Sequence, residues 1–207
     1  MKNKTLFAVL AVAFAAGALA FVFAYSTAPS PSPQLTFTAA AVTEDGRGVI
    51  VPFRMYLIQG SGRILVNVAG TTFTDDVENS LRKARLNAER VVGRSLSSVD
   101  LVLETAAEQR AVSGESAGTA FTMAIASLAS NRPLREGTAV SAALAENGTL
   151  MEVDGVEEKI LAALAVDKKV FVVAEGQEIR DEAALASLGV VVVRAQDVFE
   201  AARMLLS

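Results

Sequence analysis

The order of strand-like and helix-like segments is the feature that most constrains the fold of this 207-residue chain. Three strand-like segments follow one another, and helix-like and strand-like segments then alternate. The expected strands are Leu35–Val42, Gly48–Gln59, Arg63–Ala69, Asp100–Glu104, Thr138–Leu144, Thr149–Val153, Val170–Ala174 and Gly189–Arg194. The expected helices are about 74–92, Ser116–Ala129, Gly155–Val166, Asp181–Leu188 and Ala195–Leu206. This order predicts an α+β domain, or an α/β domain with a mixed sheet and packed helices.

Two lysines and an uncharged stretch from Thr5 to Ala28 open the sequence. The apolar part, Leu6–Ala24, would span about 28 Å as a helix, close to the hydrocarbon thickness of a bilayer. We therefore expect a hydrophobic helix over residues 1–25 that anchors the chain in a membrane, with the remainder outside the cytoplasm. The alternative is a signal peptide cleaved after the small residues Ser26 and Ala28, which would give a secreted protein.

Alternating prolines and serines make residues 26–34 unsuitable for a hydrophobic core. Pro29, Pro31 and Pro33 favour an extended spacer. The folded domain is therefore expected to cover residues 35–207.

The composition removes several classes of function. The chain contains no histidine and no cysteine, which excludes Ser-His-Asp triads, thiol nucleophiles and metal sites built on these side chains. The net charge is −4 and no basic stripe is present, so nucleic acid is not an expected partner. The sequence supports neither a metal nor an organic cofactor, and it has no Gly-x-x-x-x-Gly-Lys-Ser/Thr loop of an ATPase module.

Ser116 lies in Gly114-Glu115-Ser116-Ala117-Gly118, where a helix is expected to begin. Free backbone N–H groups and the positive end of the helix dipole can stabilise an oxyanion at such a position. A loop that merely begins a helix is the other interpretation. Ser80 and Lys83 also have a Ser-x-x-Lys spacing, but they lie on a charged helix without the partner motifs of β-lactamase-like enzymes.

Without histidine, a lysine is the candidate base for a serine nucleophile. Lys159 lies at one margin of the apolar helix face formed by Val156, Ile160 and Ala163. Burial there would lower the pKa of its amine and favour the neutral form. The alternative is a lysine whose stem follows the helix edge while its amine reaches water.

These two segments together resemble the proteolytic domain of Lon proteases, which use a serine–lysine dyad. Residues 114–118 match the family pattern Gly-x-Ser-Ala-Gly. Residues 154–159 match Gly-Gly-hydrophobic-x-x-Lys, except that Asp154 replaces the first glycine, and Lys159 follows Ser116 by the 43 positions that suit the family. The archaeal, membrane-associated branch looks similar, because an acidic residue directly precedes the serine.

The resemblance implies an α+β fold related to a ribosomal-protein domain, and a serine endopeptidase. Because this sequence departs from the family in having no ATPase motif, we expect it to act without ATP, on peptides or unfolded segments. The resemblance makes Ser116 the nucleophile and Lys159 the base. Gly114 and Glu115 would support the oxyanion, and Ser141 would take the place of a threonine that supports the dyad. The resemblance also implies a homo-oligomer, the hexameric ring of the family.

Glu152 and Asp154 depart from the family pattern, since they replace a proline and a glycine before the lysine. A carboxylate facing the amine would raise its pKa and oppose catalysis. A catalytically inactive, membrane-tethered binding or assembly module therefore stays open, as does self-cleavage in the linker. The sequence also contains a glycosylation sequon at Asn147.

Overall fold

The computed structural model describes residues 33–68, 75–105 and 115–207. The hydrophobic helix expected over 1–25 lies outside these residues, as do the linker up to residue 32 and Gly114. Within the described ranges no helix is both long and apolar enough to cross a bilayer.

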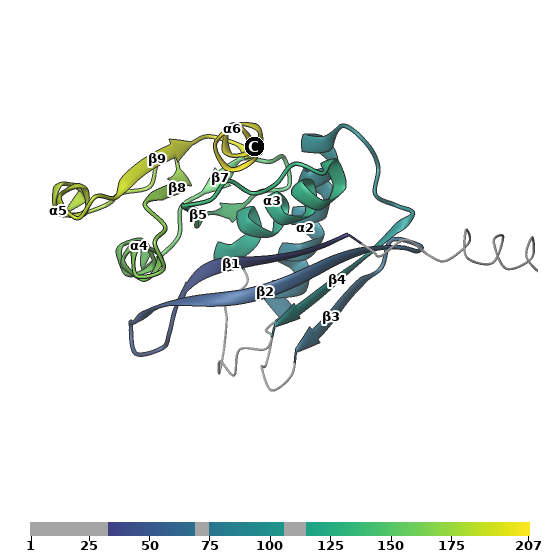
Figure 1. The fold of residues 1–207 in the computed structure, drawn as a ribbon, viewed down its shortest axis with the longest axis horizontal. Helices are drawn as coiled ribbons and strands as arrows, with labels where there is room; N and C mark the ends of the chain where they lie inside the picture. Colours follow the sequence, from purple (N-terminus) through teal and green to yellow (C-terminus); the bar gives the residue numbers. More distant parts are fainter. Residues whose placement is uncertain (1–32, 69–74, 106–114) are drawn as a thin grey trace, which may run out of the picture. The chain divides into compact units, whose positions relative to one another are not determined.

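A four-stranded sheet forms the N-terminal half of the described domain (Figure 1). Its strands are β1 (Gln34–Val42), β2 (Gly48–Gln59), β3 (Ile64–Val68) and β4 (Val99–Thr105), in the order β1-β2-β4-β3. The β1–β2 and β2–β4 pairs are antiparallel, whereas β3 and β4 are parallel. A parallel pair needs a long crossover, and helix α2 (Asp75–Val92) lies in that connection. This sheet is therefore mixed, as predicted.

Alternation along β2 directs one face of this sheet into the core. Val51, Phe53, Met55 and Leu57 are buried there. The Phe53 ring packs edge-on against Phe121 of α3 (Gly118–Ser130), with a centroid distance of 5.4 Å. This contact fixes α3 on the sheet, and α3 follows the short 3-10 turn Glu115–Ala117 that contains Ser116.

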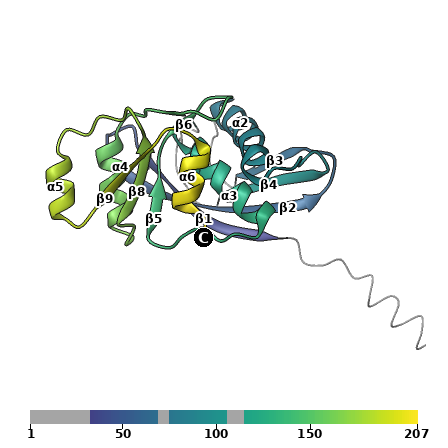
Figure 2. The same ribbon diagram turned by 90° about the horizontal axis from the view of Figure 1, so that it is seen from above.

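A separate parallel sheet forms the C-terminal half (Figure 2). It contains β5 (Thr138–Val140), β8 (Val170–Ala174) and β9 (Val191–Ala195), and its helices are α4 (Val156–Leu164), α5 (Glu182–Ser187) and α6 (Val198–Leu205). Phe171 and Val173 of β8 pack in one core cluster with residues of α4 and α5, while Val172 and Ala174 belong to the other cluster with α6. Both faces of β8 are thus covered, as its continuous apolar sequence requires.

The expected strand Thr138–Leu144 is divided in two, which corrects the prediction. Its first part is β5, and its last two residues form β6 (Ala143–Leu144), which pairs antiparallel with β7 (Leu150–Met151). Directly after β5, the Ser141 N–H donates to the carbonyl of Val172 in β8 at 3.1 Å. The described strands consequently form three sheets rather than one.

The turn predicted at Asn147-Gly148 is confirmed between β6 and β7. Gly148 has φ 95, a conformation that glycine adopts at little cost. The Asn147 side chain accepts a hydrogen bond from the Thr149 N–H at 3.1 Å. Residues 152–155 follow this hairpin and connect it to α4.

Candidate active site

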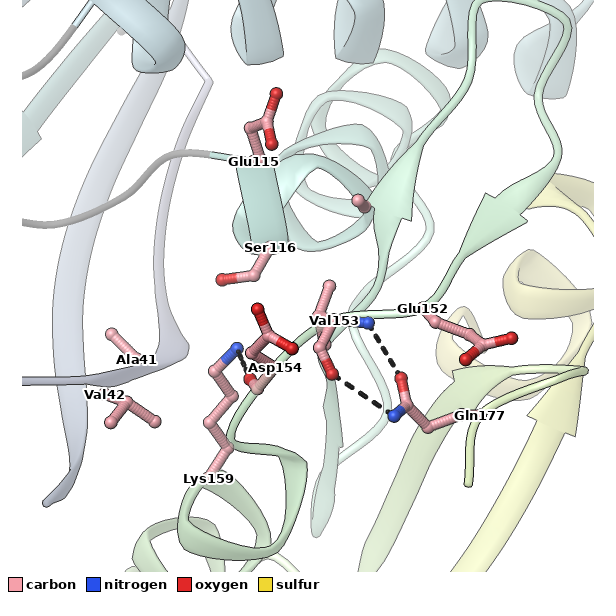
Figure 3. A pocket seen from close by; sticks show the side chains of 10 residues that line it. Ala41, Val42, Glu115, Ser116, Glu152, Val153, Asp154, Lys159 and Gln177 are labelled. Atoms are coloured by element: carbon pink, nitrogen blue, oxygen red, sulfur yellow. Dashed lines mark hydrogen bonds between the residues drawn. The ribbon is translucent and has the colours of Figure 1, made fainter. Parts of the chain in front are cut away.

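A pocket of about 450 Å³ contains both Ser116 and Lys159. The end of β1, β6, the 3-10 turn Glu115–Ala117, the segment between β7 and α4, and the loop after β8 contribute to its walls. Figure 3 shows the Ser116 and Lys159 side chains pointing into the same space from opposite sides. Two residues that are 43 positions apart are therefore brought to one site, although no hydrogen bond joins their side chains.

Ser116 is half-buried in the 3-10 turn that precedes α3. Thr119, in the first turn of α3, donates its hydroxyl to the Ala142 carbonyl at 3.0 Å, which ties the start of the helix to the segment between β5 and β6. Gly118 lies so close to β6 that an added Cβ would sit 3.2 Å from the Leu144 Cβ. The turn that carries Ser116 is thus held against the hairpin by packing and by a buried hydrogen bond.

Ser141 is fully buried and contacts the backbone of the serine rather than the lysine amine. Its hydroxyl donates to the Ser116 carbonyl at 3.4 Å, the outer limit of a hydrogen bond. Its N–H is held by β8, as described above. Ser141 therefore lies behind the nucleophile candidate, and any effect on the amine of Lys159 would be indirect.

Lys159 is buried, with only 4% of its surface exposed, on the first turns of α4. Its Nζ donates to the backbone carbonyl of Asp154 at 2.8 Å. Burial lowers the pKa of the amine from its ordinary value of 10.5, while the carboxylates of Asp154 and Glu158 act in the opposite direction and only reduce the shift. Of the two alternatives for Lys159, the structure therefore shows the buried amine rather than one that reaches water.

The two unusual acidic residues before the lysine point in different directions (Figure 3). Asp154 extends into the pocket, and its charge raises the pKa of Lys159. Glu152 extends away from the amine toward Gly176, where an added Cβ would lie 2.6 Å from its Oε1. Of these two departures from the family pattern, only Asp154 acts on the lysine.

Some of the other predicted residues line the pocket, and others do not. Glu115 is exposed and lines the pocket beside Ser116, while Gly114 lies outside the described residues. Ser80 and Lys83 lie on α2 and do not line the pocket. Gln177, which does line it, was not predicted, because a single glutamine in a polar turn carries no periodic signal.

Comparison with known proteins identifies the family. Residues 36–200 match the Lon protease (S16) C-terminal proteolytic domain. The chain therefore belongs to this family, which is a family of serine peptidases. Its mixed α and β structure fits such a domain.

Individual relatives agree with this assignment. The chain is 30% identical over 128 residues to "Lon protease homolog 2, peroxisomal" of Caenorhabditis elegans, and the match covers 61% of the chain and 16% of the relative. It is 30% identical over 124 residues to the protein of the same name in Caenorhabditis briggsae, covering 59% and 16%. It is 33% identical over 107 residues to "Lon protease" of Phenylobacterium zucineum (strain HLK1), covering 50% and 14%. The chain thus matches only a small part of the length of these curated relatives.

Proposed function

We propose that the chain is a serine endopeptidase in which Ser116 is the nucleophile and Lys159 the general base. The observation that carries the proposal is the buried Lys159 amine, with its lowered pKa, facing Ser116 across one pocket. A lysine must be neutral to accept a proton, and burial without a paired carboxylate is the usual way to achieve this. Membership of a serine peptidase family supports the same assignment.

In the proposed reaction, neutral Lys159 takes the hydroxyl proton of Ser116 as Oγ attacks the peptide carbonyl. Backbone N–H groups around Glu115 and Ser116 stabilise the oxyanion of the tetrahedral intermediate. Lys159 then returns the proton to the leaving amine, which leaves an acyl ester on Ser116. In the second half, Lys159 accepts a proton from the water that attacks the acyl ester. Lys159 then returns this proton to Ser116 Oγ, which releases the acid and regenerates the serine hydroxyl and the neutral amine.

We further propose that the substrates are peptides or unfolded protein segments, cleaved without ATP. The apolar stretch 6–24 and the Pro/Ser spacer after it support a membrane-tethered enzyme of the archaeal type, with its catalytic domain outside the cytoplasm. A ring of identical subunits is proposed from the family alone. Glycosylation at Asn147 stays a prediction of the sequence.

Labelling with a fluorophosphonate probe tests the nucleophile directly. We expect the full-length protein to become phosphonylated at Ser116, as located by peptide mass spectrometry, because only an activated serine reacts quickly. Ser116→Ala is expected to abolish labelling, while Ser187→Ala, a change on the exposed face of α5, leaves it intact. Absence of label at every pH from about 6 to 10 would contradict the proposal and favour a non-catalytic binding module.

Asp154→Asn is expected to move the acid limb of the kcat/KM–pH profile to lower pH. The limb reports the pKa of the essential base in the free enzyme, and removal of the Asp154 carboxylate removes a charge that raises the pKa of Lys159. Glu152→Gln is the matched control, since Glu152 points away from the amine, and its profile should keep the wild-type midpoint. A midpoint that moves in Glu152→Gln but not in Asp154→Asn would show that the base is not Lys159.

A further inference from the structure

Gln177 is a buried polar side chain at the edge of the active-site pocket. It lies in the turn after β8, is 7% exposed, and its backbone N–H donates to Ala174 at 3.0 Å. Its Oε1 accepts from the Val153 N–H at 2.9 Å, and its Nε2 donates to the carbonyls of Val153 at 3.2 Å and Glu178 at 3.3 Å. Each polar atom of the amide therefore has a partner.

The paired contact with Val153 reproduces one rung of a β-ladder (Figure 3). A side-chain amide offers a carbonyl and an N–H in the same plane, so it can bond both backbone groups of one residue. Residues 152–155 belong to neither β7 nor α4. Gln177 therefore supplies, for this short segment, the backbone pairing that a neighbouring strand would otherwise provide.

The segment held in this way controls the surroundings of Lys159. Asp154 follows Val153 directly, its carbonyl accepts from Lys159 Nζ at 2.8 Å, and its carboxylate enters the pocket. The loop that carries Gln177 is anchored in turn to α4, because Arg180 Nε donates to Glu157 at 2.9 Å. A continuous set of contacts thus connects the β8 loop, the segment 153–154 and the Lys159 amine.

We propose that Gln177 is a positioning residue for the dyad: by holding the backbone of Val153, it fixes the Asp154 carbonyl that orients the Lys159 amine toward Ser116. This inference rests on the proposed function. A purely space-filling residue could be apolar, whereas an apolar side chain here would leave both backbone groups of Val153 without their partner. Displacement of a reacting group by about 1 Å can reduce a rate by about 100-fold, so a small shift of the segment would suffice.

Gln177→Met tests the inference in the full-length protein, with peptide hydrolysis and amide hydrogen exchange measured together. Methionine keeps the approximate size of the side chain and removes both hydrogen-bonding groups. We expect kcat to fall between about 10- and 100-fold, KM to stay within about twofold, and the Val153 amide to exchange faster. Gln196→Met, the same substitution at an exposed glutamine, should change none of these.

Gln177→Glu is the second variant if the methionine variant does not fold. It keeps the side-chain length and an acceptor for the Val153 N–H but loses the donors to both carbonyls, so the same fall in kcat is expected. A folded variant with lowered melting temperature, unchanged kcat and faster exchange at Val153 would show that Gln177 is only structural and would overturn the inference. If the wild type itself hydrolyses no peptide, the proposed function fails and the positioning role fails with it.

Discussion

Lys159→Met is expected to lower kcat for peptide hydrolysis by about 10²- to 10⁴-fold, the range that a positioned general base contributes. Methionine retains the buried stem of the lysine but cannot accept the proton of Ser116. The measurement is steady-state hydrolysis of a fluorogenic peptide, with phosphonylation of Ser116 as a second readout that does not depend on the choice of peptide. Lys169→Met, at an exposed lysine, is the matched control and should retain wild-type kcat.

Lys159→Met should also be more stable than the wild type at neutral pH. Because the pKa of Lys159 is lowered in the folded protein, the unfolded state binds the proton more tightly, and stability rises with pH between the folded and unfolded pKa values. The cost of burying the amine is therefore complete below the folded pKa and disappears above about 10.4, the pKa of a free lysine. Lys159→Met should raise the melting temperature most at low pH and hardly at all near that upper limit.

Lys159→Arg separates the charge of the residue from its role as a base. Arginine stays protonated at every pH at which proteins fold, so it cannot accept a proton from Ser116. A fall in kcat as large as that of Lys159→Met is expected. If Lys159→Arg keeps kcat within about tenfold of the wild type, proton transfer to residue 159 is not part of the mechanism.

Local signals in the sequence were sufficient to place Ser116 near a helix start and Lys159 at the margin of an apolar helix face. The margin of an apolar helix face predicts burial of Lys159, and the structure leaves 4% of it exposed. The expected helix start at Ser116 differs by only a short 3-10 turn before α3. Both predictions use signals within one short segment, namely helical periodicity for Lys159 and the position at an expected helix start for Ser116.

Features that depend on contacts between distant segments were not predictable in the same way. The expected strand Thr138–Leu144 is divided because its first three residues pair with β8, whereas its last two pair with β7. The opposite directions of Glu152 and Asp154 depend on where Gly176 and the pocket lie. Gln177 binds a backbone 24 positions away, and no local pattern distinguishes it from a solvated glutamine.

Gly48 shows how far this dependence on distant contacts extends, since it lies at the start of β2 yet determines the position of α4. An added Cβ at Gly48 would overlap the carbonyl oxygen of Glu158 and approach the Ala162 Cβ to 3.2 Å. Val42, which pairs with Gly48 across β1 and β2, lies equally close to Gly155 before α4. A Cβ added at Gly155 would be 2.6 Å from Val42 Cγ2. The first turns of α4, which carry Lys159, therefore fit only against a strand without a side chain at residue 48.

Gly48→Ala should accordingly reduce both stability and activity. Overpacking of this kind costs about 1–3 kcal/mol in the free energy of unfolding, to be measured by denaturant titration. Relief of the overlap moves α4, and a displacement of about 1 Å at Lys159 would lower kcat by about 100-fold.

Gly46→Ala, in the same hairpin, distinguishes loss of stability from displacement of the helix. Gly46 has φ 81 and no atoms near an added Cβ, so alanine there costs about 1 kcal/mol through its backbone conformation alone. The Gly46 variant should keep wild-type kcat although it is less stable. Equal kcat in the two folded variants would mean that β2 does not position α4, because both substitutions would then act on stability only.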